Sequence, residues 1–299
     1  MIPRRHFLST TAALAAGAAA TAGAVDAAAA GSDFTFVHVT DMHIQPELDA
    51  ANATRRCFEK INTVRPDLVI TGGDLIFDAL EKPYDHARKL FELYQQTART
   101  LQPPVHNVIG NHDVFGLHVQ SGVSPKDPNY GKKMYEDRFG KTYSSFDHKG
   151  WHFILLDSIG MGEDRRFYGF IDPAQIEWLR GDLEKTGKER PIIVVTHMPL
   201  VTGVIPFTGQ PVESQRMMVV TNAHEVLKLL SGYGVKAVLQ GHTHVREVVD
   251  YLGCKYITSG SVAGAWWKGA WMGHPEGFGV LRVQNGEVSW RYEQYRRNA

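Results

Sequence analysis

Apolar and polar positions follow one another in a pattern that predicts strands alternating with amphipathic helices. The apolar run at 34–40 is typical of a buried strand, and the segment at 49–66 has helical spacing that ends at a proline. A second apolar run at 67–74, an amphipathic helix at 84–101 and a third strand within 105–113 continue the series. Strands that alternate with helices in this way predict parallel pairing, with the helices packed on the faces of the sheet.

The second half of the chain predicts a long loop, further strands and one well-marked helix. The helix starts with an aspartate followed by a proline, the usual order at a helix N-terminus. The expected elements, in chain order, are a loop at 114–131, a hairpin at 143–158 turning at Lys149-Gly150, a helix at 172–186, strands at 191–200 and 235–245, a strand at 255–262, and a closing hairpin that turns at Asn285-Gly286.

Five of the predicted strands end in polar side chains. An unpaired polar group costs about 2–7 kcal/mol to bury, so these clusters are expected to bind something. In open α/β sheets, ligands gather at the carboxyl ends of the strands, where all five clusters fall. Each cluster alone has an ordinary explanation as a turn or loop, but five at equivalent positions do not. The clusters are Asp41 with His43, Asp74, Asn111 with His112, His197, and His242 with His244.

The donor types of these clusters favour a pair of metal ions. Carboxylate, amide and imidazole groups without a thiolate suit Mn, Fe or Zn. A carboxylate can bridge two cations, and two metals roughly 3.5–4 Å apart are a common device for activating water against a phosphate ester. The residues therefore indicate phosphoester hydrolysis.

At this point the chain resembles the calcineurin-like metallophosphoesterases. Five short motifs carry the resemblance, in identity, order and spacing, and together they cover essentially all of the chain after its N-terminal segment. They are DMH at 41–43, GGD at 72–74, GNHD at 110–113, TH at 196–197 and GHTH at 241–244. The resemblance implies a four-layer α/β/β/α sandwich with two metal ions at its crest.

The resemblance also implies roles for the residues. Asp41, His43 and His244 would hold the first metal, Asn111, His197 and His242 the second, and Asp74 would bridge them. A water or hydroxide bridging the two metals, which we expect to be Fe, Mn or Zn, would attack phosphorus in line.

His112 has no ligand role in this scheme. It is expected to be catalytic, protonating the leaving oxygen or stabilising the charge on the phosphoryl group. Asp113 or Asp78 is a candidate for orienting it, and a capping role for Asp113 is equally compatible with the sequence.

Differences from individual branches of this family narrow the choice of the branch that the chain resembles. The tyrosine that purple acid phosphatases carry three residues after the bridging aspartate is Phe77 here, and His43, which they lack, is present. The chain is thus similar to the bacterial cyclic-nucleotide phosphodiesterases and their exported phosphatase relatives. We expect hydrolysis of phosphomonoesters or phosphodiesters, with cyclic nucleotides as the alternative substrate.

The first thirty residues predict an export signal. Arg4 and Arg5 precede an alanine-rich apolar stretch, which ends in small residues suited to cleavage between Ala24 and Gly31. The paired arginines resemble a twin-arginine signal, which implies a periplasmic or extracellular protein. A disordered tail and an uncleaved anchor are the alternatives. The enzyme domain is expected at 31–299, with no stable membrane insertion after signal removal.

The net charge gives no indication of a polyanionic partner. The 32 basic and 32 acidic residues cancel, and loss of Arg4, Arg5 and Asp26 would leave a net charge of −1 (−2 and +1). No nucleic-acid partner is therefore expected, and a nuclease is disfavoured. A non-catalytic metal-binding module on the same fold is a further alternative, which the complete set of ligand residues opposes. Oligomeric state is not predicted.

Two segments are candidates for choosing the substrate. The 114–131 loop contains His118, and a glycine-rich segment at 264–279 contains Trp266, Trp267 and Trp271. Tryptophans there would stack on a base or cover a sugar or lipid, or else simply cover an edge of the sandwich. The adjacent Arg165 and Arg166 would clamp a second phosphate or lie solvated on the surface.

Overall fold

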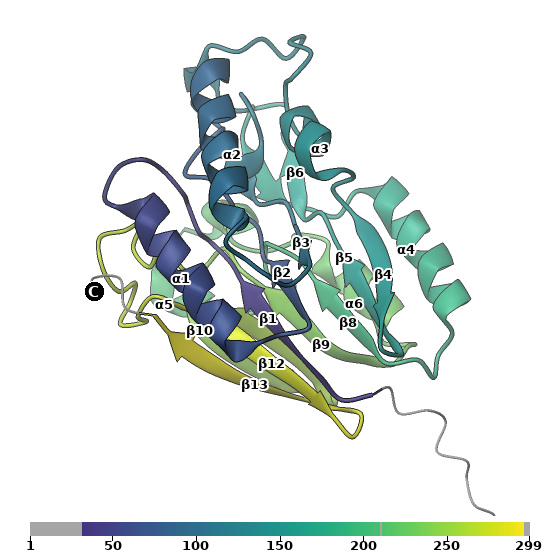
Figure 1. The fold of residues 1–299 in the computed structure, drawn as a ribbon. Helices are drawn as coiled ribbons and strands as arrows, with labels where there is room; N and C mark the ends of the chain where they lie inside the picture. The colour runs from purple at the N-terminus through teal and green to yellow at the C-terminus, as the bar shows by residue number, and fades with distance from the viewer. Residues whose placement is uncertain (1–31, 210, 296–299) are drawn as a thin grey trace, which may run out of the picture. The chain divides into compact units, whose positions relative to one another are not determined.

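The structure is a computed structural model that describes residues 32–209 and 211–295. The expected export signal at 1–30 lies outside the described residues. The described chain forms two large sheets that face each other, and helices cover their outer faces (Figure 1). This arrangement is the four-layer α/β/β/α sandwich that the sequence predicted.

The first sheet contains the strands at both ends of the described chain. Its order is β13-β12-β1-β2-β3, with β1, β2 and β3 parallel and β12 antiparallel to β1. Two helices, α1 (Ala50–Val64) and α2 (Tyr84–Ala98), connect the parallel strands and pack against each other. The strands are β1 (Phe34–Val39), β2 (Leu68–Thr71), β3 (Val105–His106), β12 (Gly277–Gln284) and β13 (Glu287–Gln294).

The second sheet is built from the middle of the chain. Its order is β10-β11-β9-β8-β5-β4, and β5, β8, β9 and β11 are parallel. The strands are β4 (Ser144–His148), β5 (Trp151–Leu155), β8 (Ile192–Val195), β9 (Val235–Gln240), β10 (Arg246–Tyr251) and β11 (Cys254–Ser259). The remaining elements are α3 (Lys133–Phe139), β6 (Ile159–Met161), β7 (Phe167–Gly169), α4 (Pro173–Thr186), α5 (Ile205–Thr208), α6 (Ala223–Leu230), and the 3₁₀ turns η1 (Asn111–Asp113), η2 (Val119–Ser121) and η3 (Val212–Met217).

A buried apolar layer joins the two sheets. Phe36 of β1 and Phe153 of β5 are fully buried and meet edge to face, with ring centroids 5.4 Å apart. Apolar side chains from most strands of both sheets complete this layer. Burial of apolar area, about 25 cal/mol per Å², holds the sheets together. It thereby fixes the strand ends from which the polar clusters project.

The third strand is shorter than predicted. Only Val105 and His106 pair with β2, because side chains replace the ladder beyond them. The Thr71 hydroxyl accepts a hydrogen bond from the Val108 amide, and Asn107 accepts one from the Tyr94 hydroxyl. The β6–β7 ribbon and strand β10 were not predicted, since both are short or half-exposed and carry weak alternation.

Two further observations concern membranes and cysteines. Within residues 32–209 and 211–295, no helix combines the length and apolar character needed to cross a bilayer. Cys57 is buried in α1, Cys254 is half-buried in β11, and both are free thiols.

Candidate metal centre

Loops at the carboxyl ends of the parallel strands of both sheets bring the predicted polar clusters together. Asp41 and His43 follow β1, and Asp74 follows β2. His197 follows β8, and His244 follows β9 in the opposite sheet. Asn111, whose segment follows β3, and His242, which also follows β9, complete the set. Because each side chain leaves its strand at the same edge, residues 200 positions apart become neighbours.

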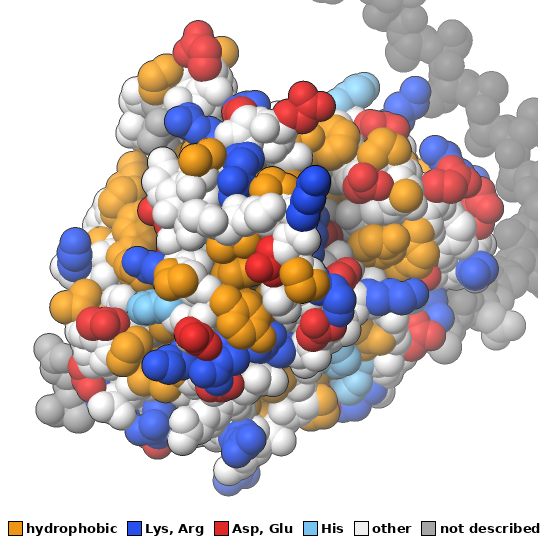
Figure 2. Space-filling model, turned by 90° about the horizontal axis from the view of Figure 1, so that it is seen from above, with side chains coloured by type: hydrophobic (Ala, Val, Ile, Leu, Met, Phe, Trp, Pro, Cys, Tyr) orange, Lys and Arg blue, Asp and Glu red, His pale blue; other side chains and the backbone are white. Residues whose placement is uncertain are grey.

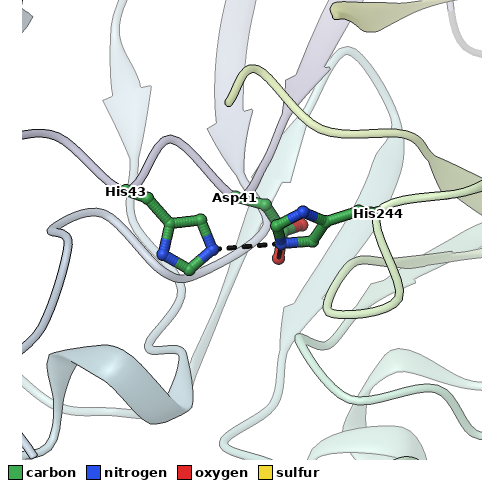
Figure 3. Close-up of side chains that lie close together, drawn as sticks. All are labelled: Asp41, His43 and His244. Atoms are coloured by element: carbon green, nitrogen blue, oxygen red, sulfur yellow. Dashed lines mark hydrogen bonds and ion pairs between the residues drawn. The ribbon is translucent and has the colours of Figure 1, made fainter. Parts of the chain in front are cut away.

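One group consists of Asp41, His43 and His244, and all three are buried (Figure 3). The Nε2 atoms of His43 and His244 lie 3.0 Å apart, and His244 Nε2 lies 3.2 Å from Asp41 Oδ1. Two nitrogens bound at right angles to one ion at about 2.1 Å would lie about 3.0 Å apart. The spacing therefore suits a shared cation.

A second group consists of Asp74, His197 and His242. His197 Nε2 lies 3.3 Å from Asp74 Oδ2 and 3.1 Å from Asn111 Oδ1, so the amide belongs to the same group. Asp74 Oδ2 also lies 3.6 Å from His43 Nε2 of the first group. Asp74 is thus the carboxylate that lies between the two groups, the place that a bridging ligand requires.

Backbone carbonyls orient three of the four predicted histidine ligands. His197 Nδ1 lies 2.7 Å from the Gly72 carbonyl oxygen, and His244 Nδ1 lies 2.6 Å from that of Gly264. His242 uses its other nitrogen, with Nε2 at 2.7 Å from the Met217 carbonyl oxygen. A nitrogen beside a carbonyl must carry the proton, which leaves the lone pair on the nitrogen that faces the site. The tautomers therefore fit metal binding.

The electrostatics of the centre fit cations as well. Burial lowers the pKa of His43 well below its usual value and that of His242 to about 4, so both imidazoles are neutral, the form in which an imidazole can bind a metal. Burial alone would raise the pKa of Asp74, but the neighbouring histidines, His197 foremost, lower it well below its usual range. Two buried carboxylates, at Asp41 and Asp74, need compensating positive charge, which bound metal ions would supply.

The backbone around the centre is strained. Asp41, His43, Asp74, His242 and His244 all have positive φ angles, between 41° and 70°. Such angles are uncommon outside glycine, and they cluster where function requires a particular side-chain direction. Here they turn each side chain back toward the middle of the centre.

Gly110 allows the closest backbone approach. A Cβ at this position would overlap both the backbone nitrogen and the carboxylate of Asp74, so no other residue fits without displacing the central carboxylate. The glycine of the GNHD motif is therefore a spacing requirement.

His112 lies at the edge of the centre and is partly open to solvent. Its ring lies 4.8 Å from that of His43, and its Nδ1 lies 3.5 Å from Asp78 Oδ1. Burial would lower its pKa, but the carboxylates of Asp74 and Asp78 outweigh this effect and raise the pKa above the usual value. The Asp113 carboxylate instead accepts hydrogen bonds from the amides of Gly110, Leu75 and Ile76. Asp113 therefore caps backbone, and Asp78 is the neighbour of His112.

The three tryptophans of the 264–279 segment have different positions. The Trp266 ring lies 4.7 Å from that of His244, and Trp271 meets Trp266 edge to face at 5.3 Å. Both line a cavity of about 650 Å³ that Asn111 and His112 also line. Trp267 is 1% exposed and donates its indole N–H to the His43 carbonyl. Its surroundings are those of a core residue that supports the His43 loop.

The other proposed substrate residues also differ in whether they line the cavity. His118 stacks on Phe167 at 6.1 Å and lies 3.0 Å from a Glu81 carboxylate oxygen, so it stands behind the cavity wall. Arg165 donates to the carbonyls of Gly116, Leu117 and Val123, and so it holds the long loop rather than a phosphate. Arg166, its neighbour, lines the cavity.

Sequence reasoning missed the opposite wall of this cavity. Phe167 comes from β7, Phe207 from α5 and Met217 from the end of η3. These residues lie in a region without regular periodicity, and no motif marks them. The one signal in the sequence was the cluster of apolar residues at 204–220, between the TH and GHTH motifs, which contains Phe207 and Met217 but not Phe167.

Comparisons with known proteins agree with the geometry. The family model of the calcineurin-like phosphoesterases matches residues 34–246. A probable cyclic nucleotide phosphodiesterase from Synechococcus sp. is 24% identical over 74% of this chain and 79% of its own length. One from Moraxella catarrhalis is 28% identical, over 56% of this chain and 57% of its own length. The crystal structure of a dimetal phosphatase from Danio rerio superimposes with a TM-score of 0.58 at 16% identity, covering 86% of this chain and 98% of that one, which shows a shared fold.

Proposed function

Since the chain belongs to the calcineurin-like phosphoesterase family and is a metal-dependent phosphoric ester hydrolase, we propose that it is an exported enzyme that hydrolyses phosphodiesters or phosphomonoesters. The observation that carries this proposal is the convergence of carboxylate, amide and imidazole donors from five loops on one buried site. A fold alone would not need this convergence, because buried charges without a ligand are destabilising.

We assign two neighbouring metal positions to these donors. Asp41, His43 and His244 would hold one ion, and Asn111, His197 and His242 would hold the other. Asp74 lies between them and would bind both. When bound, such ions, of Fe, Mn or Zn, polarise a phosphoryl oxygen and lower the pKa of water.

His112 is the residue that we assign to proton transfer. It is partly exposed to the cavity, and the nearby carboxylates of Asp74 and Asp78 favour its protonated form. A protonated imidazole donates a hydrogen bond to a phosphoryl oxygen or transfers its proton to the departing alkoxide. Asp78, 3.5 Å from Nδ1, would keep the ring turned so that Nε2 points to the substrate.

The similarity to probable cyclic nucleotide phosphodiesterases supports diesters among the substrates and makes cyclic nucleotides the second candidate. The argument against a signalling role is the predicted export signal, which would take the enzyme away from cytosolic nucleotides. A nucleic-acid substrate has no support from charge. On the face shown in Figure 2, basic and acidic side chains are interspersed.

The direct test is a substrate panel with the metal-loaded protein. We expect hydrolysis of bis(p-nitrophenyl) phosphate or p-nitrophenyl phosphate, abolished by a chelator and restored by Mn or Zn. Cyclic AMP and cyclic GMP belong in the same panel. Preferential turnover of these two would favour the second candidate, and no turnover of any ester would overturn the proposal.

Export has its own test. Replacing Arg4 and Arg5 together by lysine would block a twin-arginine signal. We expect the protein to move from the periplasmic fraction to the cytoplasmic fraction of the expressing cell. An unchanged distribution would contradict this route.

A further inference from the structure

The cavity beside the metal centre is largely apolar. Its volume is about 650 Å³, within the range of about 300–1,000 Å³ that is usual for small-molecule sites. Asn111, His112 and His242 form its inner end, and the walls are mainly aromatic and thioether side chains. The principal wall residues are Phe167, Phe207, Met217, Trp266, Trp271 and Met272.

One wall extends outward from the first metal position. Trp266 packs beside both His43 and His244, with ring centroids at 5.8 Å and 4.7 Å. Trp271 stands edge to face on Trp266 and continues the aromatic surface away from the centre. Both indoles are half-buried and line the cavity, and each also borders a second hollow beside Gln45 and Leu48.

The other wall extends outward from the second metal position. Phe167 lies edge to face with His242, at 6.1 Å between centroids, and Met217 accepts the hydrogen bond from His242 Nε2. An ester bound at the centre would therefore have an apolar surface on both sides of the group that it carries.

Two exposed apolar side chains stand at the mouth. Phe207 is 77% exposed and Met272 is 46% exposed, although both line the cavity. Large apolar side chains left in water beside a concave site indicate a ligand that covers them. Of the described residues that line the cavity, none is acidic and Arg166 is the only one with a guanidinium group. The charge at this site thus suits one phosphate, and the walls suit an uncharged apolar group.

We propose that this cavity binds an alkyl or aryl ester group of the substrate, so that the enzyme prefers phosphate esters with a large apolar group. This inference rests on the proposed phosphoester hydrolysis and goes beyond it by naming the substrate class. A small polar alcohol such as glycerol would leave the walls in water. The apolar group comes either from a dispersed ester or from a lipid in a bilayer, since both present the same surface.

A homologous series tests the proposal. Alkyl p-nitrophenyl phosphates with methyl, butyl and hexyl groups share one leaving group, so the reacting bond stays constant while apolar area grows. The metal-loaded enzyme should show kcat/KM rising up to about fourfold for each methylene that is fully buried. Measurable turnover with a flat chain-length profile would overturn this inference and leave the proposed function standing. No turnover of any member, with turnover of p-nitrophenyl phosphate retained, would also overturn this inference. No turnover of the series or of p-nitrophenyl phosphate would overturn the proposed function itself.

Variants at the mouth of the cavity test whether the cavity causes the dependence of kcat/KM on chain length. Phe207→Ser, at an exposed position where unfolding is not expected, should at least halve the slope of log kcat/KM against chain length. Leu252→Ser is the matched control, because Leu252 is 88% exposed and does not line this cavity. It should leave the slope unchanged. Equal slopes in wild type and Phe207→Ser would contradict the proposal that the mouth of the cavity contacts the apolar group of the substrate.

Two additional measurements separate catalysis from binding and identify the source of the ester. Octylphosphonate, which cannot be hydrolysed, should bind the metal-loaded protein at least tenfold more tightly than methylphosphonate by calorimetry, and equal affinities would count against the cavity. Phosphatidylglycerol vesicles provide the lipid. Release of glycerol (leaving phosphatidate) or of glycerophosphate (leaving diacylglycerol) from them, together with the rise in the soluble series, identifies a bilayer source. The rise alone identifies a dispersed ester.

Discussion

The metal centre and the apolar cavity share a boundary but are built in different ways. The centre uses side chains that lie two to five residues beyond the end of a strand, and most are buried. The outer cavity uses the start of β7, the segment after β8 that contains α5 and η3, and the loop after β11, and Phe207 and Met272 remain exposed there. The rigid strands thus fix the reacting groups, while the irregular segments form the part that contacts the rest of the substrate.

The hydrogen bonds of the two regions tie them together. Met217 belongs to the cavity wall, and its carbonyl orients His242 of the centre. Gly264 begins the segment that contains Trp266, and its carbonyl orients His244. A change in either wall can therefore reach the centre through backbone atoms, but a side-chain substitution in the wall need not. The predictions below therefore treat changes at the metal centre and its backbone separately from side-chain changes in the cavity wall.

Removing the central carboxylate should have the largest effect. Asp74→Ala takes away the carboxylate that lies within reach of both metal positions. Losing this ligand should cost several kcal/mol, so hydrolysis should fall on the order of 10³-fold or more. Asp250→Ala, at an exposed carboxylate on β10, is the matched control and should retain activity. Full activity and metal content in Asp74→Ala would refute the bridging position.

His112→Ala should affect turnover without affecting the metals. Loss of a proton donor lowers kcat by about 10²–10⁴-fold, while the ligand set stays complete. Metal analysis and ester hydrolysis, measured on the same sample, check both parts. His224→Ala, at an exposed position in α6, should match the wild type. Loss of metal together with activity would show that His112 is a ligand.

Gly110→Ala should damage the centre through the backbone. The added methyl group overlaps Asp74, and crowding of this kind costs about 1–3 kcal/mol of folding free energy. Gly181→Ala is the contrasting change, because nothing lies within 4 Å of its Cβ in α4 and it should stabilise the helix by roughly 0.5–1 kcal/mol. Urea denaturation measures both. A Gly110→Ala protein as stable and as rich in metal as the wild type would contradict the close approach.

Trp271→Ala should have the smallest effect and should act on preference. The side chain touches Trp266 and the cavity but none of the predicted ligands, so KM should rise about threefold to tenfold for apolar esters, with kcat little changed. Tyr251→Ala, at an exposed aromatic on β10, is the control. Equal losses across small and large esters would place Trp271 in the chemistry and not in substrate choice.

The sequence predicted the sandwich and the convergence of polar clusters because both depend on short-range patterns. Apolar runs located β1, β2, β8 and β9, and the polar residues that end them share one edge by geometry. The division of labour between Asp78 and Asp113 was left open, since it depends on which backbone amides approach a carboxylate. Residue-level patterns carry no such information.

The cavity was largely beyond prediction for a related reason. Trp266 and Trp267 are adjacent and chemically identical in the sequence, yet one lines the cavity and the other is buried beneath His43. Both also have positive φ angles, so the backbone conformation does not distinguish them either. Phe207 and Met217 come from segments whose path is decided by tertiary packing, so no local pattern marked them.

Metal content measured beside activity tests the central claim most directly. The purified protein should contain two metal ions per chain, lose hydrolysis when a chelator removes them, and regain it when Mn or Zn is returned. Undiminished ester hydrolysis by protein that elemental analysis shows to be free of metal would contradict the account.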